Sequence, residues 1–155
     1  MTTPSEGIFD LITGLPVHPL IIHLVVVMVP LSVLFMGLAI FLPRVRKVLT
    51  PIALAFAGIA AASAVIAERS GVALQERVGP SGLHGEQGIA LTPVVIMFTV
   101  ASFVWAFAAR GKTPLWRWLS RILAITLLGL GAAAIVLTVL AGHSGAELTW
   151  GNRVG

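Results

Sequence analysis

The sequence contains no cysteine among its 155 residues. The chain therefore has no disulfide, no thiolate ligand for a metal and no thiol nucleophile, and it lacks the cysteines through which a c-type haem is attached. Any metal that the protein binds must be held by histidine, carboxylate or methionine side chains.

Charge is also scarce, because only 10% of the residues are Asp, Glu, Lys or Arg, whereas soluble domains carry about 25%. The hydrophobic share is 57% and the mean hydropathy is +1.01. We conclude that this is a membrane protein with no room for a sizeable soluble domain. The net charge of +4 comes from basic residues placed between apolar runs. Membrane topology explains that placement better than nucleic-acid binding, which we exclude.

Four apolar runs predict four membrane-spanning helices. About 20 apolar residues in a helix cross the hydrocarbon layer, and a backbone in lipid must satisfy its own hydrogen bonds. The runs cover residues 19–42, 51–67, 89–109 and 119–141. The sequence thus predicts an all-α membrane protein with a single transmembrane domain over residues 1–155. Short connections favour an up-down-up-down bundle of four transmembrane helices.

The charges in the connections predict which side of the membrane each connection occupies. The connections after the first and third runs contain no acid. Their basic residues are Arg44, Arg46, Lys47, Arg110, Lys112, Arg117 and Arg121. Basic connections stay in the cytoplasm, whereas the acids lie in the N-terminal tail, at Glu6 and Asp10, in residues 68–88, and after the fourth run at Glu147. We therefore expect a multi-pass protein of a bacterial plasma membrane with its N and C termini outside.

In this topology all four histidines, His18, His23, His84 and His143, lie at the outer end of the bundle. Pro19 suits the first helical position, which makes His18 the expected cap and places His23 about 7.5 Å deeper along the axis. An imidazole without a partner there costs about 1 to 3 kcal/mol, so we expect His23 to hydrogen-bond across helices, face water or bind a metal. Two interpretations stay open for the group, an interfacial hydrogen-bonding role and ligation of a metal or haem iron.

Other residues near the histidines fit a haem site and also have ordinary explanations. Gly142 and Gly145 flank His143 and leave room for a planar macrocycle, although glycines also end helices. Arg69 and Arg77 offer guanidinium groups to haem propionates, or they balance neighbouring glutamates instead. We treat all of these as candidate cofactor-binding residues.

Motifs of common enzymes are missing from the sequence. It has no glycine-rich phosphate loop, no His-Glu-x-x-His pair and no serine in a nucleophile elbow. No hydrolase or transferase motif is present, so enzyme activity stays an open question. The middles of the apolar runs carry no ionisable residue, which counts against a transporter or a proton pump.

Three segments form a specific combination of motifs. They are residues 14–23 (GLPVHPLIIH), 68–79 (ERSGVALQERVG) and 142–151 (GHSGAELTWG). Together they resemble the actinobacterial branch of DUF2231, a family of four-helix integral membrane proteins of unknown function. That family commonly has His-Glu-Glu-Leu-Gly before its third span, where this chain has His-Gly-Glu-Gln-Gly at residues 84–88. The resemblance implies the four-span fold and directs attention to the four histidines.

Three functions are open on this evidence. The leading hypothesis is a redox carrier that binds b-type haem between two imidazoles for electron transfer. We expect His23 and His143 as its axial ligands, because the first and last helices are neighbours in an up-down bundle, and His18 and His84 as their partners or as ligands of a second site. The second hypothesis is zinc or copper held by three or four of the same imidazoles.

The third hypothesis is an accessory or structural subunit of a larger membrane assembly, with no cofactor and with interfacial histidines. The lipid bilayer is the expected partner in every case. A homodimer, a membrane-protein partner and a redox partner are further candidates, because the small residues of the second and fourth runs allow close helix contacts.

Overall fold

The structure is a computed structural model that describes residues 11, 12 and 15–151, and side chains from Val17 to Gly151 except that of Arg77. The acidic N-terminal tail with Glu6 and Asp10 lies outside the described residues. Four long helices follow one another: α1 (Val17–Phe41), α2 (Arg46–Val78), α3 (Leu83–Ala108) and α4 (Pro114–Trp150). Before them, the two-residue strands β1 (Leu11–Ile12) and β2 (Leu15–Pro16) pair antiparallel.

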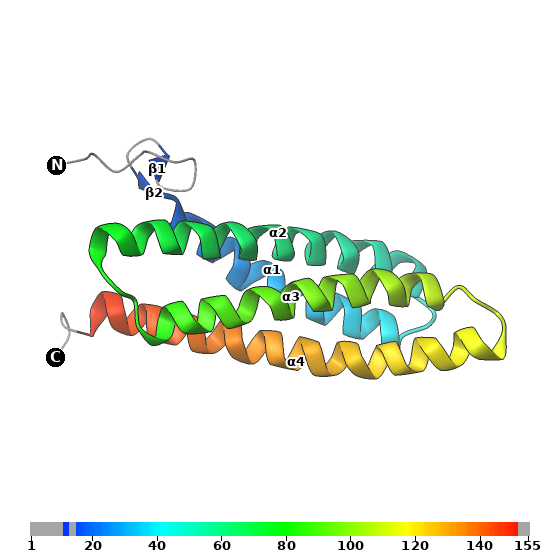
Figure 1. The fold of residues 1–155 in the computed structure, drawn as a ribbon. Coiled ribbons are helices and arrows are strands. Elements are labelled where there is room, and N and C mark those ends of the chain that lie inside the picture. The colour runs from blue at the N-terminus through cyan, green and yellow to red at the C-terminus, as the bar shows by residue number, and fades with distance from the viewer. Residues whose placement is uncertain (1–10, 13–14, 152–155) are drawn as a thin grey trace.

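The four helices form an up-down-up-down bundle (Figure 1), which confirms the predicted fold class. Packing is most extensive between α1 and α2 and between α3 and α4. We call these pairs the first and the second hairpin. The starts of α1 and α3 meet the ends of α2 and α4 at what we call the histidine end, and the α1–α2 and α3–α4 turns lie at the opposite, basic end.

All four helices are long and apolar enough to cross a membrane. Large apolar side chains point outward along the bundle, among them Leu34, Val100, Phe103, Ile125 and Val139. In water this surface would be unfavourable, whereas in a bilayer it contacts lipid. The chain is therefore a multi-pass membrane protein whose outer surface contacts the lipid bilayer.

The helices α2 and α4 continue past the ends of their apolar runs at the histidine end. The runs end at residues 67 and 141, but the helices reach Val78 and Trp150. The connection to α3 contains Gly79 at φ +95° and Gly82 at φ +53°, a backbone region that favours glycine. As a result, the histidine end is surrounded by helices rather than by a loose loop.

The interior contains two apolar clusters. One lies toward the basic end and includes Met36, Phe98, Trp105 and Leu127. The other consists of Val25, Val29, Ala60, Ala64, Leu91, Val95 and Ala134. Alanines dominate the α2 side of both clusters, which allows close approach of helix backbones in lipid. The second cluster forms the floor beneath the histidine end.

Arg46, the first residue of α2, joins three helices at the basic end. Its Nε donates to the carbonyl of Ala39 at 2.9 Å and its Nη2 donates to that of Ile40 at 3.0 Å. Both carbonyls belong to the last turn of α1, where no following helical N–H is available. The same guanidinium lies 5.2 Å from the centre of the buried Trp105 ring of α3.

Candidate functional site

His18 and His84 face each other at the histidine end, from the first turns of α1 and α3. Their ring centroids are 5.9 Å apart and their planes are inclined by 75°. The Nδ1 atom of His18 lies 2.8 Å from the carbonyl oxygen of Ala67 on α2. The Nδ1 atom of His84 lies 2.9 Å from the carbonyl oxygen of Ala141 on α4. Each ring is thus held by the other helix of its own hairpin.

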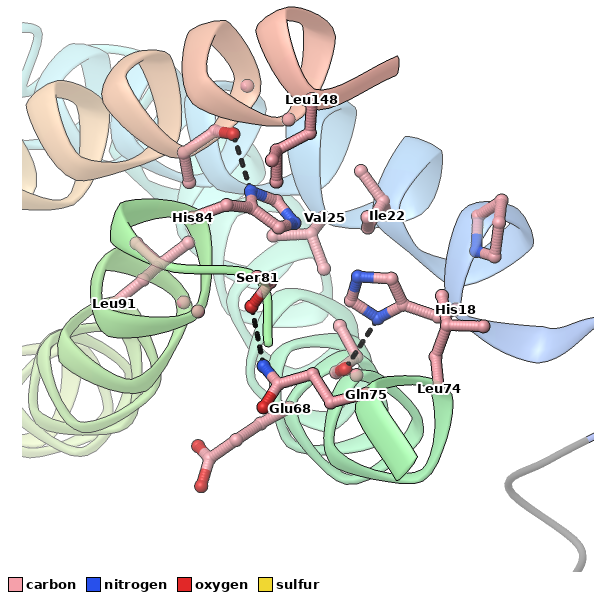
Figure 2. A pocket seen from close by; sticks show the side chains of 18 of the residues that line it. His18, Ile22, Val25, Glu68, Leu74, Gln75, Ser81, His84, Leu91 and Leu148 are labelled. Carbon is pink, nitrogen blue, oxygen red and sulfur yellow. Dashed lines mark hydrogen bonds between the residues drawn. The ribbon is translucent and has the colours of Figure 1, made fainter. Parts of the chain in front are cut away.

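These two hydrogen bonds fix the tautomer of both rings. A carbonyl oxygen only accepts, so each Nδ1 must carry a proton and donate it. In the neutral form of each ring, Nε2 then carries the lone pair, and neither Nε2 has a hydrogen-bond partner within the part of the chain that the structure describes. Figure 2 shows both rings pointing into the same space. Both imidazoles therefore turn Nε2 toward a shared cavity.

Glycines make room for both rings. A Cβ atom at Gly71 would lie 2.9 Å from Cε1 of His18, and one at Gly145 would lie 3.0 Å from Cε1 of His84. Relaxed carbon contacts are about 3.5 to 4.0 Å, so a larger residue would push each ring away from its carbonyl. The space beside Gly145 is taken by the His84 ring.

The cavity between the two imidazoles has a volume of about 710 Å³ and is lined by all four helices. Its side chains are mostly apolar, and Figure 2 shows Ile22, Val25, Leu74, Leu91 and Leu148 around the rings. On one side, Gln75 Nε2 donates to Ser81 Oγ at 2.5 Å. This volume and this apolar lining are typical of small-molecule and cofactor sites.

His23 and His143, the pair expected from the sequence, are both exposed, and the structure brings His18 and His84 together instead. The Nδ1 atom of His23 lies 2.7 Å from the carbonyl of Pro19 in its own helix. The Nε2 atom of His143 lies 3.4 Å from Oε1 of Glu147, and these side chains are 74% and 67% exposed. Helix geometry explains the position of His23, because five residues turn it by about 140° around the axis from His18.

The remaining candidate residues are two arginines of α2 and Gly142. Arg69 is exposed on α2, and Arg77 lies on the same helix with its side chain outside the described part. Gly142 borders the cavity, and a Cβ atom there would meet nothing within 4 Å. Of the two glycines flanking His143, only Gly145 is in close contact with an imidazole.

A metal site with more than two histidines is not assembled in the described residues. Among them, no three His, Asp or Glu side chains lie close enough to hold one metal ion. The expected zinc or copper site needed three or four imidazoles, whereas the structure brings together two. The arrangement suits a metal whose remaining ligands come from elsewhere, as they do in a porphyrin.

The family model described as "Predicted membrane protein (DUF2231)" matches residues 14–155 of the chain. The chain belongs to the DUF2231 family. This confirms the family resemblance of the sequence, and it applies to the family as a whole rather than to its actinobacterial branch. Comparisons with curated proteins and with solved structures found no match.

Sequence reasoning on this DUF2231 protein missed the groups that hold the two rings. These are the carbonyls of Ala67 and Ala141 and the glycine at position 71. A signal was available, because residues 67–71 read Ala-Glu-Arg-Ser-Gly and residues 141–145 read Ala-Gly-His-Ser-Gly. The pattern Ala-x-x-Ser-Gly thus occurs where both the second and the fourth apolar run reach the histidine end.

Proposed function

We propose that this membrane protein binds a b-type haem between His18 and His84 and carries electrons at the histidine end. The observation that carries the proposal is the pair of facing imidazoles, each with Nδ1 bonded to a carbonyl and Nε2 directed into the cavity. Histidine ligands of metals usually donate their other ring N–H to such an acceptor, which fixes ring orientation and raises ligand basicity.

The distance between the two rings supports iron ligation. Two imidazoles on opposite faces of one iron, with metal–nitrogen distances of about 2 Å, have ring centroids about 6 Å apart. The centroids of His18 and His84 are 5.9 Å apart. This separation is close to the one that axial ligation requires, which supports the proposal.

The surroundings of the rings also suit a porphyrin. The cavity volume of about 710 Å³ lies within the range of about 300 to 1,000 Å³ for small-molecule sites. Apolar side chains from all four helices line the cavity and would face the edge of a macrocycle bound there. A haem bound here supplies one-electron chemistry, while the chain supplies ligation, orientation and a low dielectric.

We further propose that the histidine end faces the outside of a bacterial plasma membrane. Both acid-free basic connections lie at the opposite end of the bundle. Each basic residue near an anionic inner leaflet contributes about 1 kcal/mol, so the connections favour the cytoplasmic side. The proposed haem would then exchange electrons with a partner near the outer surface.

Absorption spectroscopy of the protein purified in detergent and mixed with haemin tests the haem proposal. The wild type should show a Soret band that sharpens and shifts on reduction. His18→Ala and His84→Ala should each lose the low-spin spectrum. His143→Ala is the matched control, because His143 is exposed at the same end and does not line the cavity, and it should keep that spectrum. His23 lines the cavity, but its Nδ1 is bonded within α1, so we expect His23→Ala to keep the low-spin spectrum as well.

Other outcomes would support other functions. Loss of the low-spin spectrum only in the His23 and His143 variants would mean that these two residues, as expected from the sequence, are the axial ligands. That result would overturn the assignment to His18 and His84. Bound zinc or copper without colour would support the non-haem metal hypothesis. A protein with neither metal nor colour would support the accessory-subunit hypothesis, with the two imidazoles serving as interhelical hydrogen-bond donors.

A further inference from the structure

The two hairpins hold their imidazoles with the same set of contacts. In the first hairpin, the carbonyl of Ala67 accepts from His18 Nδ1 at 2.8 Å and from Ser70 Oγ at 3.1 Å. In the second, the carbonyl of Ala141 accepts from His84 Nδ1 at 2.9 Å and from Ser144 Oγ at 3.2 Å. One residue beyond each serine, a glycine lies against the ring.

These contacts correspond to the repeated pattern Ala-x-x-Ser-Gly at residues 67–71 and 141–145. We infer that each copy forms a binding site for one imidazole ring, which we call an imidazole seat. The seat holds its histidine in the Nδ1–H tautomer. Its serine hydroxyl sets how much electron density that imidazole donates to a metal through Nε2. The serines are thus positioning residues that act through the carbonyl. The tautomer part stands by itself, whereas the donor-strength part rests on the proposed haem function.

The serine acts on the imidazole because one carbonyl oxygen accepts from two donors. A second donor withdraws electron density from the oxygen and makes it a weaker acceptor for Nδ1–H. The imidazole then donates less electron density to the iron through Nε2. Because ferric iron needs that density more than ferrous iron does, weaker donation favours the ferrous state. Removing the hydroxyl should strengthen the Nδ1–H bond to the carbonyl and lower the reduction potential.

The two serines should differ in the size of this effect. Ser144 Oγ also donates to Oε1 of Gln87 at 2.6 Å, which is the shorter of its two contacts. Ser70 Oγ donates to Ala67 and lies 3.3 Å from His18 Nδ1. Because the single hydroxyl proton of Ser144 is directed mainly at Gln87, Ser70→Ala should shift the potential more than Ser144→Ala.

Potentiometric titration of the haem-loaded full-length protein tests the donor-strength part. Ser70→Ala should lower the midpoint potential while keeping the low-spin spectrum, and Ser70→Thr should restore the wild-type value because it keeps a hydroxyl. Ser63→Ala is the matched control. Ser63 is buried on the same helix and makes the same bond three residues back, to Ala60 at 3.0 Å, but its carbonyl holds no imidazole. An unchanged potential in Ser70→Ala, or an equal shift in Ser63→Ala, would overturn this part.

Nitrogen NMR of labelled histidine in the haem-free protein tests the tautomer part. His18 and His84 should both show the Nδ1–H tautomer, with resonances assigned through the two histidine-to-alanine variants. Finding Nε2–H at either residue would overturn the seat, even if haem binds. Finding Nδ1–H at both residues in a protein that fails to bind haem would overturn the proposed function and the donor-strength part, and leave the seat intact.

Discussion

At the scale of single residues, the histidine end depends on close contacts between imidazole rings and helix backbone. Each ring lies between a carbonyl that accepts its Nδ1–H and a glycine that leaves no side chain in its path. The rings therefore have little freedom to rotate away from one another. Such preorganisation of a ligand by its surroundings lowers the cost of binding.

Gly145→Ala should weaken haem binding at His84. The new Cβ would lie 3.0 Å from Cε1 of that ring, so the ring must move and its bond to Ala141 must lengthen. We expect a loss of affinity of about tenfold, or about 1.4 kcal/mol, when haemin is titrated into the purified variant. Gly129→Ala is the matched control on the same helix, because its Cβ would meet nothing within 4 Å and Gly129 does not line the cavity. Equal affinities in the two variants would show that the glycine contact has no role in binding.

The inclination of the two rings predicts a spectroscopic signature for the ferric form of the proposed haem complex. The planes of His18 and His84 are inclined by 75°, which is close to perpendicular. Axial imidazoles in near-perpendicular planes give a highly anisotropic low-spin electron paramagnetic resonance signal, whereas parallel planes give a rhombic one. We expect the anisotropic form at low temperature. A rhombic signal would mean that the rings rotate on binding or that other ligands are used.

The sequence could predict where the histidines gather but not which of them meet. Loop charge and hydropathy place all four at one end, and the structure agrees, because they lie in the first turns of α1 and α3 and near the end of α4. The choice between His18 and His23 depends on the rotation of α1 about its axis. That helix is apolar on all sides, so no polar stripe marks its outer face. Only the packing of the bundle shows that Val25 is buried on the inner face of α1. His18 lies seven residues, or about two turns, before Val25 and therefore lies on the same face.

At the scale of helices, the basic end is held by side-chain capping as well as by apolar packing. Arg46 satisfies two carbonyls of α1 from the first residue of α2 and lies over Trp105 of α3. One planar guanidinium therefore links three helices. A lysine has a single ammonium group and cannot reproduce that geometry.

Arg46→Lys should lower stability while it preserves charge and topology. We expect a loss of about 1 to 2 kcal/mol, since hydrogen bonds from charged donors contribute about 1.5 to 3 kcal/mol and this site is partly exposed. The measurement is the thermal unfolding midpoint in detergent, followed by circular dichroism. Arg44→Lys is the control in the same connection, because Arg44 is exposed. Unchanged midpoints in both variants would show that the cap does not stabilise the bundle.

Helix existence was predictable from apolar runs, but helix length was not. The runs end at residues 67 and 141, where the local sequence becomes polar. The helices continue because residues 68–78 contain no proline and because α2 ends only where Gly79 takes a positive φ. Hydropathy reports contact with lipid, whereas helix length also depends on turn residues. The extra turns of α2 and α4 provide one side of the cavity.

At the scale of the whole molecule, the two ends of the bundle differ in chemistry. One end has the four histidines and described glutamates such as Glu68, Glu86 and Glu147, and the other has the two basic connections. This asymmetry follows the rule that basic connections remain cytoplasmic. It gives the bundle one expected orientation in the membrane.

The lack of native cysteine makes that orientation measurable. Ser81→Cys, in the α2–α3 connection, should react with a membrane-impermeant maleimide in intact cells, and Lys112→Cys should react only after the cells are opened. Both residues lie in connections and neither belongs to an apolar cluster, although Ser81→Cys replaces the hydroxyl that accepts from Gln75. The reverse labelling pattern would mean that the histidine end faces the cytoplasm.

The division of the bundle into two hairpins has a consequence for how the chain is made. Packing is most extensive within each hairpin, and the connection from Gly79 to Gly82 is the covalent link between them. Each hairpin has one of the two facing imidazoles together with the carbonyl that orients it. A gene cut between Gly79 and Gly82 should therefore encode two fragments that insert separately and reassemble in the same membrane. Haem colour would then appear only in cells that express both fragments, because neither fragment alone contains both ligands.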